Sequence, residues 1–92
     1  MRFDALPGAD LVVSGLADLA RGTRSAAALL VAIGAPRLRE LGVAVPELHV
    51  SAPERQLYEL LAESESDAAH SRYNALIRRL VSFERALACA GR

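Results

Sequence analysis

The sequence predicts one all-α domain, a small bundle of four main helices plus one short helix that spans residues 1–92. Three observations lead to this fold class. The chain contains 18 Ala and 15 Leu, the residue types with high helix propensity. Aromatic residues, which favour strands, make up only 4%. Apolar residues recur at spacings of three and four over most of the chain, and 92 residues supply material for a single core.

The first helix is predicted over residues 11–21. Residues 1–9 contain the turn dipeptide Pro7-Gly8 and are expected to form a flexible N-terminal segment. Asp10 is the expected N-cap and Gly22 the expected C-cap. Gly15 has two interpretations: it marks a close helix contact, or it is a tolerated weak position.

A second helix is predicted over residues 26–34, with Thr23 or Ser25 as its N-cap. Residues 26–33 are apolar on every side, and such a helix should be buried on every side. A 92-residue monomer has little material with which to surround one helix. This segment therefore predicts an oligomer, most simply a homodimer.

Gly34 and Pro36 are expected to interrupt the second helix. Pro36 suits the first turn of a separate short helix that contains Leu38 and Leu41 and ends at Gly42. Residues 43–50 have extended character and predict a connector, with a short edge strand as the alternative.

The C-terminal half predicts an antiparallel αα-hairpin. Ser51-Ala52-Pro53-Glu54 matches a capping box and predicts a helix that extends to about Glu63. The last helix is expected over residues 67–90, because apolar residues recur there at alternating spacings of four and three. That seam comprises Ala69, Tyr73, Leu76, Leu80, Phe83, Leu87 and Ala90, widened by Ile77 and Val81.

The formal net charge is zero, but the charges are segregated. Residues 1–39 carry five Arg and three Asp, residues 40–67 carry one Arg and seven acids, and residues 68–92 carry five Arg and one Glu. The balance disfavours a general nucleic-acid or membrane-surface binder. It favours complementary charges along the sides of the hairpin.

A polar stripe on the last helix is the candidate ligand or partner contact. It contains Asp67, His70, Ser71, Asn74 and Arg78. His70 could act as a general base oriented by Asp67, but Ser71 is badly placed for activation by a neighbour in sequence. The competing interpretation is a solvated helix face. We assign no catalytic residue.

Metal and cofactor chemistry find little support. His49, His70 and Cys89 are far apart and show no metal-ligand spacing, so no metal is expected. The chain has no Gly-rich phosphate loop and no Lys, and no cofactor is expected. Cys89 is expected to be a small buried or half-buried residue.

Two basic features give further hypotheses. Arg72 and Arg79 share one flank of the last helix, and Arg78 and Arg85 share another, as expected for residues that border a helix–helix interface. Arg72, Arg79 and Arg85 are therefore candidate partner-facing residues. Residues 26–43 resemble a helix-turn-helix loosely, with Arg37 and Arg39 on a second helix of barely six residues.

The sequence thus predicts a small non-catalytic protein-interaction or regulatory subunit that acts as a homodimer. One alternative is a helix-turn-helix DNA-binding regulator that uses residues 26–43. Another is a small ligand-binding or enzymatic protein that uses the stripe around His70. The start of the chain lacks a recognisable leader, and the single Cys is typical of a cytoplasmic protein, so a cytoplasmic location and no membrane partner are expected.

Overall fold

The computed structural model describes residues 5–47 and 50–90, and over these ranges the chain is all α-helical. The helices are α1 (Ala9–Ala20), α2 (Ala26–Glu40), α3 (Pro53–Ser64) and α4 (Ala69–Ala90). The predicted helical bundle is confirmed. Expectations for residues 1–4, His49 and Gly91 lie outside the described residues. No helix in the described part of the chain is long and apolar enough to cross a membrane.

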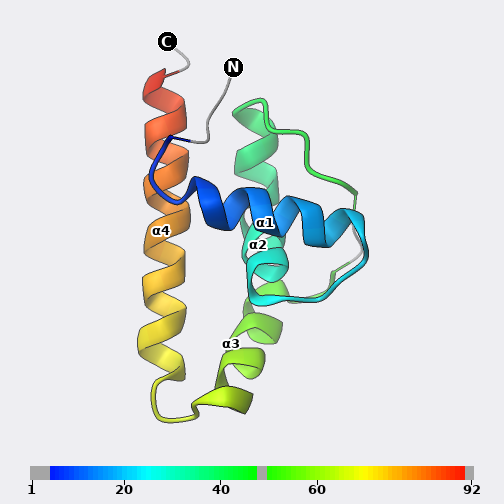
Figure 1. Cartoon of the computed structure of the whole chain (residues 1–92), viewed down its shortest axis with the longest axis vertical. Coiled ribbons are helices and arrows are strands. Elements are labelled where there is room, and N and C mark those ends of the chain that lie inside the picture. Colours follow the sequence, from blue (N-terminus) through cyan, green and yellow to red (C-terminus); the bar gives the residue numbers. More distant parts are fainter. Residues whose placement is uncertain (1–4, 48–49, 91–92) are drawn as a thin grey trace.

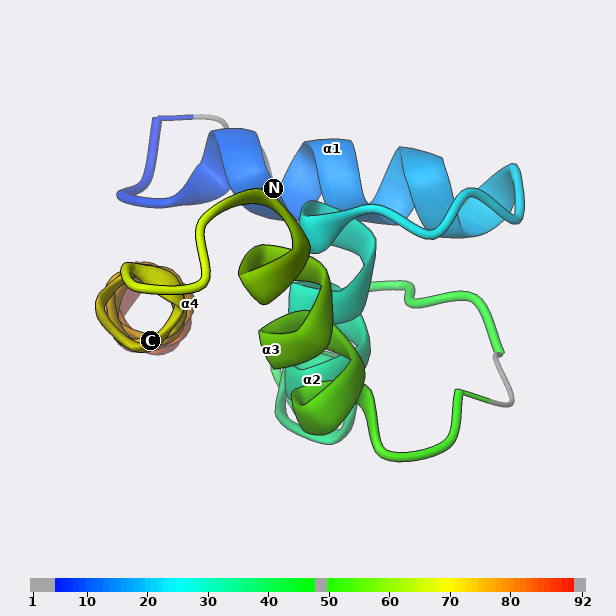
Figure 2. The same cartoon turned by 90° about the horizontal axis from the view of Figure 1, so that it is seen from below.

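The central element is α2, which packs against each of the other three helices. From α3 the chain turns at one end of the molecule and returns along α4, so the expected antiparallel hairpin is present (Figure 1). Figure 2 shows that α1 lies across one face of the layer that α2, α3 and α4 form. The connector between α2 and α3 arches away on the side remote from α4 (Figure 2).

The predicted break at Gly34 and Pro36 is wrong, because α2 runs unbroken from Ala26 to Glu40. Proline removes one backbone hydrogen bond from a helix interior. Here Pro36 is on the exposed side of α2, while Leu38 on the following turn is fully buried. Tertiary packing on both sides of Pro36 therefore outweighs the loss of one backbone hydrogen bond. The separate short helix that the sequence predicts is part of α2.

Two predicted helix ends are confirmed. The Ser25 hydroxyl accepts a hydrogen bond of 3.1 Å from the Ala28 backbone N–H and caps α2. Gly22 has a φ of 72° and follows the last turn of α1. The Thr23 backbone N–H donates to the Asp18 carbonyl oxygen at 2.8 Å, which completes the glycine-dependent termination of α1.

Two other predicted caps are wrong. The N-cap of α1 is Gly8, not Asp10, because Gly8 lies against α4. A Cβ atom at Gly8 would approach the Arg79 carbonyl oxygen to 2.6 Å, so this contact determines where α1 begins. The N-cap of α3 is Ala52 and not Ser51. The Gln56 side-chain amide donates to the Ser51 carbonyl oxygen at 2.6 Å and holds this turn without a capping box.

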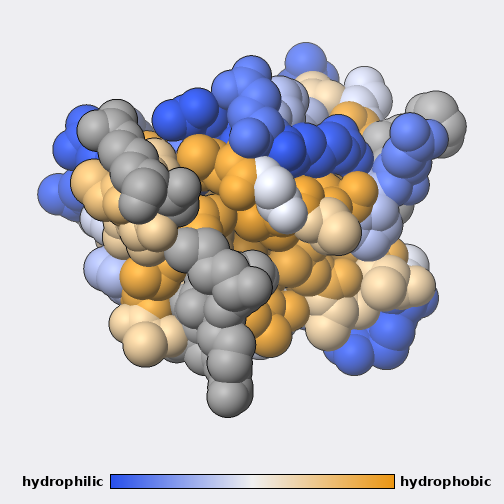
Figure 3. Space-filling model, turned by 90° about the horizontal axis from the view of Figure 1, so that it is seen from above, coloured by the Kyte–Doolittle hydropathy of each residue, from blue (hydrophilic) through white to orange (hydrophobic). Residues whose placement is uncertain are grey.

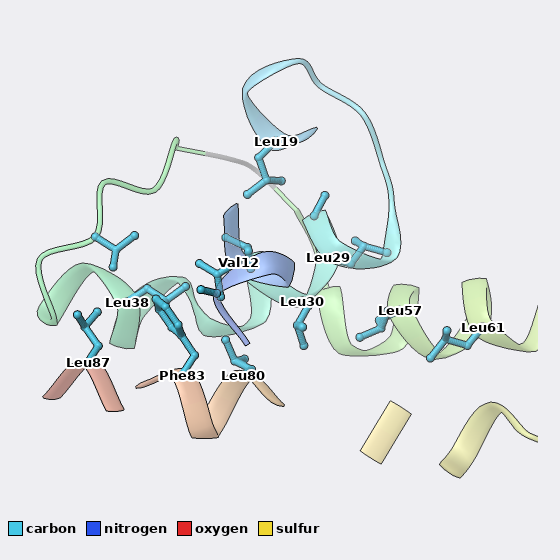
Figure 4. Close-up of a cluster of buried hydrophobic side chains, with 14 of the residues drawn as sticks. Val12, Leu19, Leu29, Leu30, Leu38, Leu57, Leu61, Leu80, Phe83 and Leu87 are labelled. Atoms are coloured by element: carbon cyan, nitrogen blue, oxygen red, sulfur yellow. The ribbon is translucent and has the colours of Figure 1, made fainter. Parts of the chain in front are cut away.

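The predicted seam of α4 forms one side of the core. Leu80, Phe83 and Leu87 are buried and point toward α2 (Figure 4). Tyr73 and Leu76 are half-buried, whereas Ala90 at the end of the seam is exposed. The largest fully buried side chains come from all four helices: Phe83, Leu30, Leu38, Leu57, Val12 and Val31.

The burial of α2 changes one sequence-based argument. Leu29, Leu30 and Val31 are each at most 2% exposed, although the structure contains a single copy of the chain. Helices α1, α3 and α4 all pack against α2. The other half of the apolar run, namely Ala26, Ala27, Ala32 and Ile33, is only half-buried. A single chain therefore buries part of this run, and the argument for a homodimer needs support from other surfaces.

Candidate functional site

The polar stripe lies on the outer surface of α4. His70, Asn74 and Arg78 are exposed. Each of them contacts the next one along the helix. The Asn74 side-chain amide nitrogen lies 3.2 Å from His70 Nε2. Arg78 Nε donates to the Asn74 backbone carbonyl oxygen at 3.4 Å. These contacts lie within one helix, so they leave the outward side of the stripe in contact with solvent.

Asp67 and Ser71 are not brought into this arrangement. The last helix begins at Ala69 rather than at the predicted residue 67. Asp67 is therefore an exposed residue of the turn before α4, where the Ala68 backbone N–H donates to the Glu65 carbonyl oxygen at 3.1 Å. Ser71 is exposed one position after His70. Within residues 5–47 and 50–90, no hydrogen bond or ion pair joins the His70 imidazole to an acid or to a nucleophile, and its partner is Asn74.

The candidate partner-facing arginines divide into two groups. Arg72 pairs with Glu65 at 2.8 Å, and Arg79 pairs with Asp10 of α1 at 2.7 Å. The hydrogen bond from Arg79 lowers the pKa of the Asp10 carboxyl below its ordinary value. Arg79 thus borders the contact between α4 and α1 within one chain. Arg85 is exposed on the outer side of α4.

The soft-metal ligands remain separated. Cys89 is exposed in the last turn of α4, so the expectation of a buried or half-buried thiol is wrong. The helix places Cys89 on the side opposite the seam, away from the core. His49 lies outside the described residues. Among the residues that the structure describes, no three His, Cys, Asp or Glu side chains form a group that could hold a metal ion.

The helix-turn-helix hypothesis loses its structural basis. It requires two helices and a turn within residues 26–43, but this region is the single helix α2 followed by a connector. Arg37 pairs with Glu40 at 3.2 Å. Arg39 donates to the carbonyl oxygens of Val45 and Pro46 at 3.3 and 3.1 Å, and so ties the connector to α2.

An apolar surface that the sequence did not indicate lies at one end of the molecule. Figure 3 shows apolar side chains at the centre of this end, with hydrophilic residues around them. The C-terminal parts of α2 and α4 both reach this end (Figure 1). Three half-buried side chains that precede α1 or follow α2, Leu6, Leu41 and Val45, pack against the core. We call Leu6, Leu41 and Val45 the apolar end.

The apolar end could not be found from periodicity. Leu6 precedes α1, Leu41 follows the last residue of α2, and Val45 belongs to the connector. None of the three lies within a helix, so no helical pattern relates them. Only the folded arrangement packs all three against one core.

The fold and these surfaces define a small helical bundle with a central helix α2. No protein-family model matches the chain, and no curated protein or solved structure matches it. Its function must therefore be inferred from the surfaces of the chain itself.

Proposed function

We propose that this chain is a small non-catalytic protein-interaction or regulatory subunit that acts as a homodimer. The observation that carries the proposal is the apolar end, where partly buried side chains pack against the core, together with the apolar surface at this end of the molecule (Figure 3). Contiguous apolar surface at the end of a small domain is typical of a protein-binding site.

The arrangement of the helices accounts for the apolar end. Helix α3 packs beside the first half of α2, and α1 crosses the bundle nearer its middle (Figure 1). No described helix other than α2 and α4 extends to this end of the molecule (Figure 1). The apolar end is therefore formed by non-helical residues, Leu6 before α1 and Leu41 and Val45 after α2. Covering the half-buried side chains there would remove further apolar area from water, which stabilises a complex by about 25 cal/mol per Å².

A second copy is the proposed partner. A twofold interface requires a surface that complements itself. Apolar surface meets this requirement, because it packs on apolar surface without paired charges. The exposed acids Glu59 and Glu63 belong to α3, which lies toward the other end of the molecule, so they are outside the proposed interface (Figure 1).

The test is the oligomeric state of the wild type and of Leu41→Arg, measured by sedimentation equilibrium at micromolar concentration. The wild type should have twice the chain mass of 9.8 kDa. Leu41→Arg should be monomeric, because a charge at the apolar end must be desolvated on association. Val13→Arg is the matched control, since Val13 is 47% exposed on α1.

Circular dichroism should show the same helix content for both variants and the wild type. A wild-type mass of 9.8 kDa throughout the concentration range would rule out the homodimer. A folded Leu41→Arg variant that remains dimeric would instead exclude the apolar end as the interface.

A further inference from the structure

A pocket of about 180 Å³ lies between α1, α2 and α3, away from the apolar end. Its apolar wall comes from Leu19 at the end of α1, Leu29 in the first turns of α2 and Val50 in the connector. Its rim carries the polar side chains of Thr23, Arg24 and Gln56. Five segments of the chain therefore contribute to one concave surface: three helices and the two segments that join them.

Two of the residues that line the pocket are small. Gly22 lines the pocket and has a φ of 72°, a conformation that favours glycine. A Cβ atom at Gly22 would meet no other atom within 4 Å. Ala28, on the opposite wall, contributes only a methyl group. The turn that ends α1 therefore leaves open space beside the first turns of α2.

The apolar wall defines one part of a ligand. Leu19 is 7% exposed and Leu29 is 2% exposed, so each presents only an edge to the pocket (Figure 4). Val50 is half-buried and supplies the more accessible part of the wall. The pocket of about 180 Å³ is open to solvent on one side, so it can cover one face of a small ring or a short aliphatic chain.

The rim defines the other part of the ligand. Arg24 is exposed in the segment between α1 and α2 and takes part in no ion pair within the described residues, whereas neighbouring Arg21 pairs with Asp18. A guanidinium group matches the planar, bidentate geometry of a carboxylate. Gln56 is held by its hydrogen bond to the Ser51 carbonyl oxygen and keeps its place at the rim.

Two acids limit the charge of the ligand. Glu59 and Glu63 line an adjacent groove on α3 together with Arg24. They attract the same guanidinium group and repel an anion that carries more than one negative charge. The surroundings of Arg24 therefore favour a single carboxylate and a weak complex.

From this geometry we infer that the pocket binds a small apolar monocarboxylate, with its hydrocarbon part against Leu19 and Leu29 and its carboxylate at Arg24. Hexanoate and benzoate are suitable probes of this class. The inference is independent of the proposed function, because the pocket is lined by none of the residues of the apolar end.

The experiment is an NMR titration of the ¹⁵N-labelled chain with sodium hexanoate, followed through backbone amide shifts. Saturable shifts should be centred on Gly22, Thr23, Leu29 and Val50. Arg24→Gln should weaken hexanoate binding by about 1.4-fold to fivefold, the range for an exposed ion pair. Arg21→Gln is the matched control from the same segment and should bind hexanoate like the wild type. Hexanol, which lacks the carboxylate, should bind the wild type and Arg24→Gln equally.

Three results would overturn the inference. The first is the absence of saturable shifts at the pocket residues with either hexanoate or benzoate. The second is equal hexanoate affinity for the wild type and folded Arg24→Gln. The third is an equal loss of affinity in Arg21→Gln, which would show that only net charge matters. The oligomeric state decides the proposed function separately, so the two proposals fail independently.

Discussion

Two glycines within helices set the distances between helices in this domain. A Cβ atom at Gly15 of α1 would lie 2.4 Å from the Ala27 carbonyl oxygen and 2.5 Å from Val31 Cγ2, both on α2. A Cβ atom at Gly34 of α2 would lie 3.0 Å from both Leu80 methyl carbons on α4. Of the two interpretations of Gly15 from the sequence, the structure supports the close helix contact.

Gly15→Ala should destabilise the domain despite the higher helix propensity of alanine. The propensity gain is about 1 kcal/mol. The obstacle is backbone of α2, which cannot rotate away, and overpacking of this kind costs about 1–3 kcal/mol or more. We expect a lower urea midpoint for Gly15→Ala. Ser14→Ala, at the neighbouring exposed position, should leave the midpoint within experimental error. A more stable Gly15→Ala variant would show that the α1–α2 distance is not fixed by this contact.

Glu84 is the half-buried acid at the contact of α2 with α4. Its Oε2 atom would lie 3.2 Å from a Cβ atom at Gly34. Burial raises the pKa of the Glu84 carboxyl above its ordinary value of 4.5, and the positive charge of Arg37 opposes this shift. The folded state therefore holds the Glu84 proton more tightly than the unfolded state does.

Glu84→Gln should stabilise the domain at neutral pH. With a raised pKa in the folded state, the contribution of Glu84 is fully present below pH 4.5 and is lost as the pH rises through the folded-state pKa. Urea melts at neutral pH should give a higher midpoint for Glu84→Gln than for the wild type, and the difference should shrink in acid. Glu59→Gln, at an exposed position, is the control. A difference that grows in acid would contradict the assigned direction of the shift.

At the scale of elements, α4 shows most directly how a sequence pattern becomes a packed face. Its seam residue Leu80 is 4% exposed and contacts the position of Gly34, whereas Asn74 is exposed on the outer stripe. The two residues therefore test the face assignment of the same helix.

Leu80→Ala should lose about 2–5 kcal/mol of unfolding free energy, because it leaves a cavity between α4 and α2. Asn74→Ala should change it by no more than about 0.5 kcal/mol. Urea melts followed by circular dichroism compare the two variants directly. If Asn74→Ala were the more destabilising variant, the outer stripe would be part of the packed interior and the face assignment would be wrong.

Long helical periods and glycine-dependent helix ends were predictable from the sequence. The seam of α4 and the helix ends at Gly22 and Gly42 depend on local patterns. Pro36 was misjudged because packing on both sides of α2 outweighs a local helix-breaking residue. The caps at Gly8 and Ala52 were missed because contacts with distant segments or a later side chain decide them.

The candidate sites depended far less on local patterns. The stripe around His70 follows from helical spacing and is present on the surface of α4. The pocket joins Leu19, Arg24, Leu29, Val50 and Gln56, which belong to five segments that only the tertiary fold brings together. The periodicity of a single sequence relates residues within one helix. It does not predict a pocket that residues from different segments form.

At the scale of the whole molecule, one exposed ion pair links the two ends of the described chain. Arg79 of α4 pairs with Asp10 of α1 across 69 positions of sequence. Exposed pairs of this kind contribute about 0.2–1 kcal/mol. The pair therefore guides the orientation of α1 on the bundle, while the buried side chains of all four helices supply most of the stability.

The central position of α2 also bears on how quickly the chain finds its fold. Helix α1 packs chiefly against α2, α2 against α3, and α3 against α4, so helices adjacent in sequence make most of the contacts. Chains dominated by local contacts close short loops and fold in microseconds to milliseconds. Only the docking of α4 on α2 and α1 joins distant parts of the chain. A nascent chain can thus assemble α1 on α2 as soon as both have been synthesised, before α4 exists.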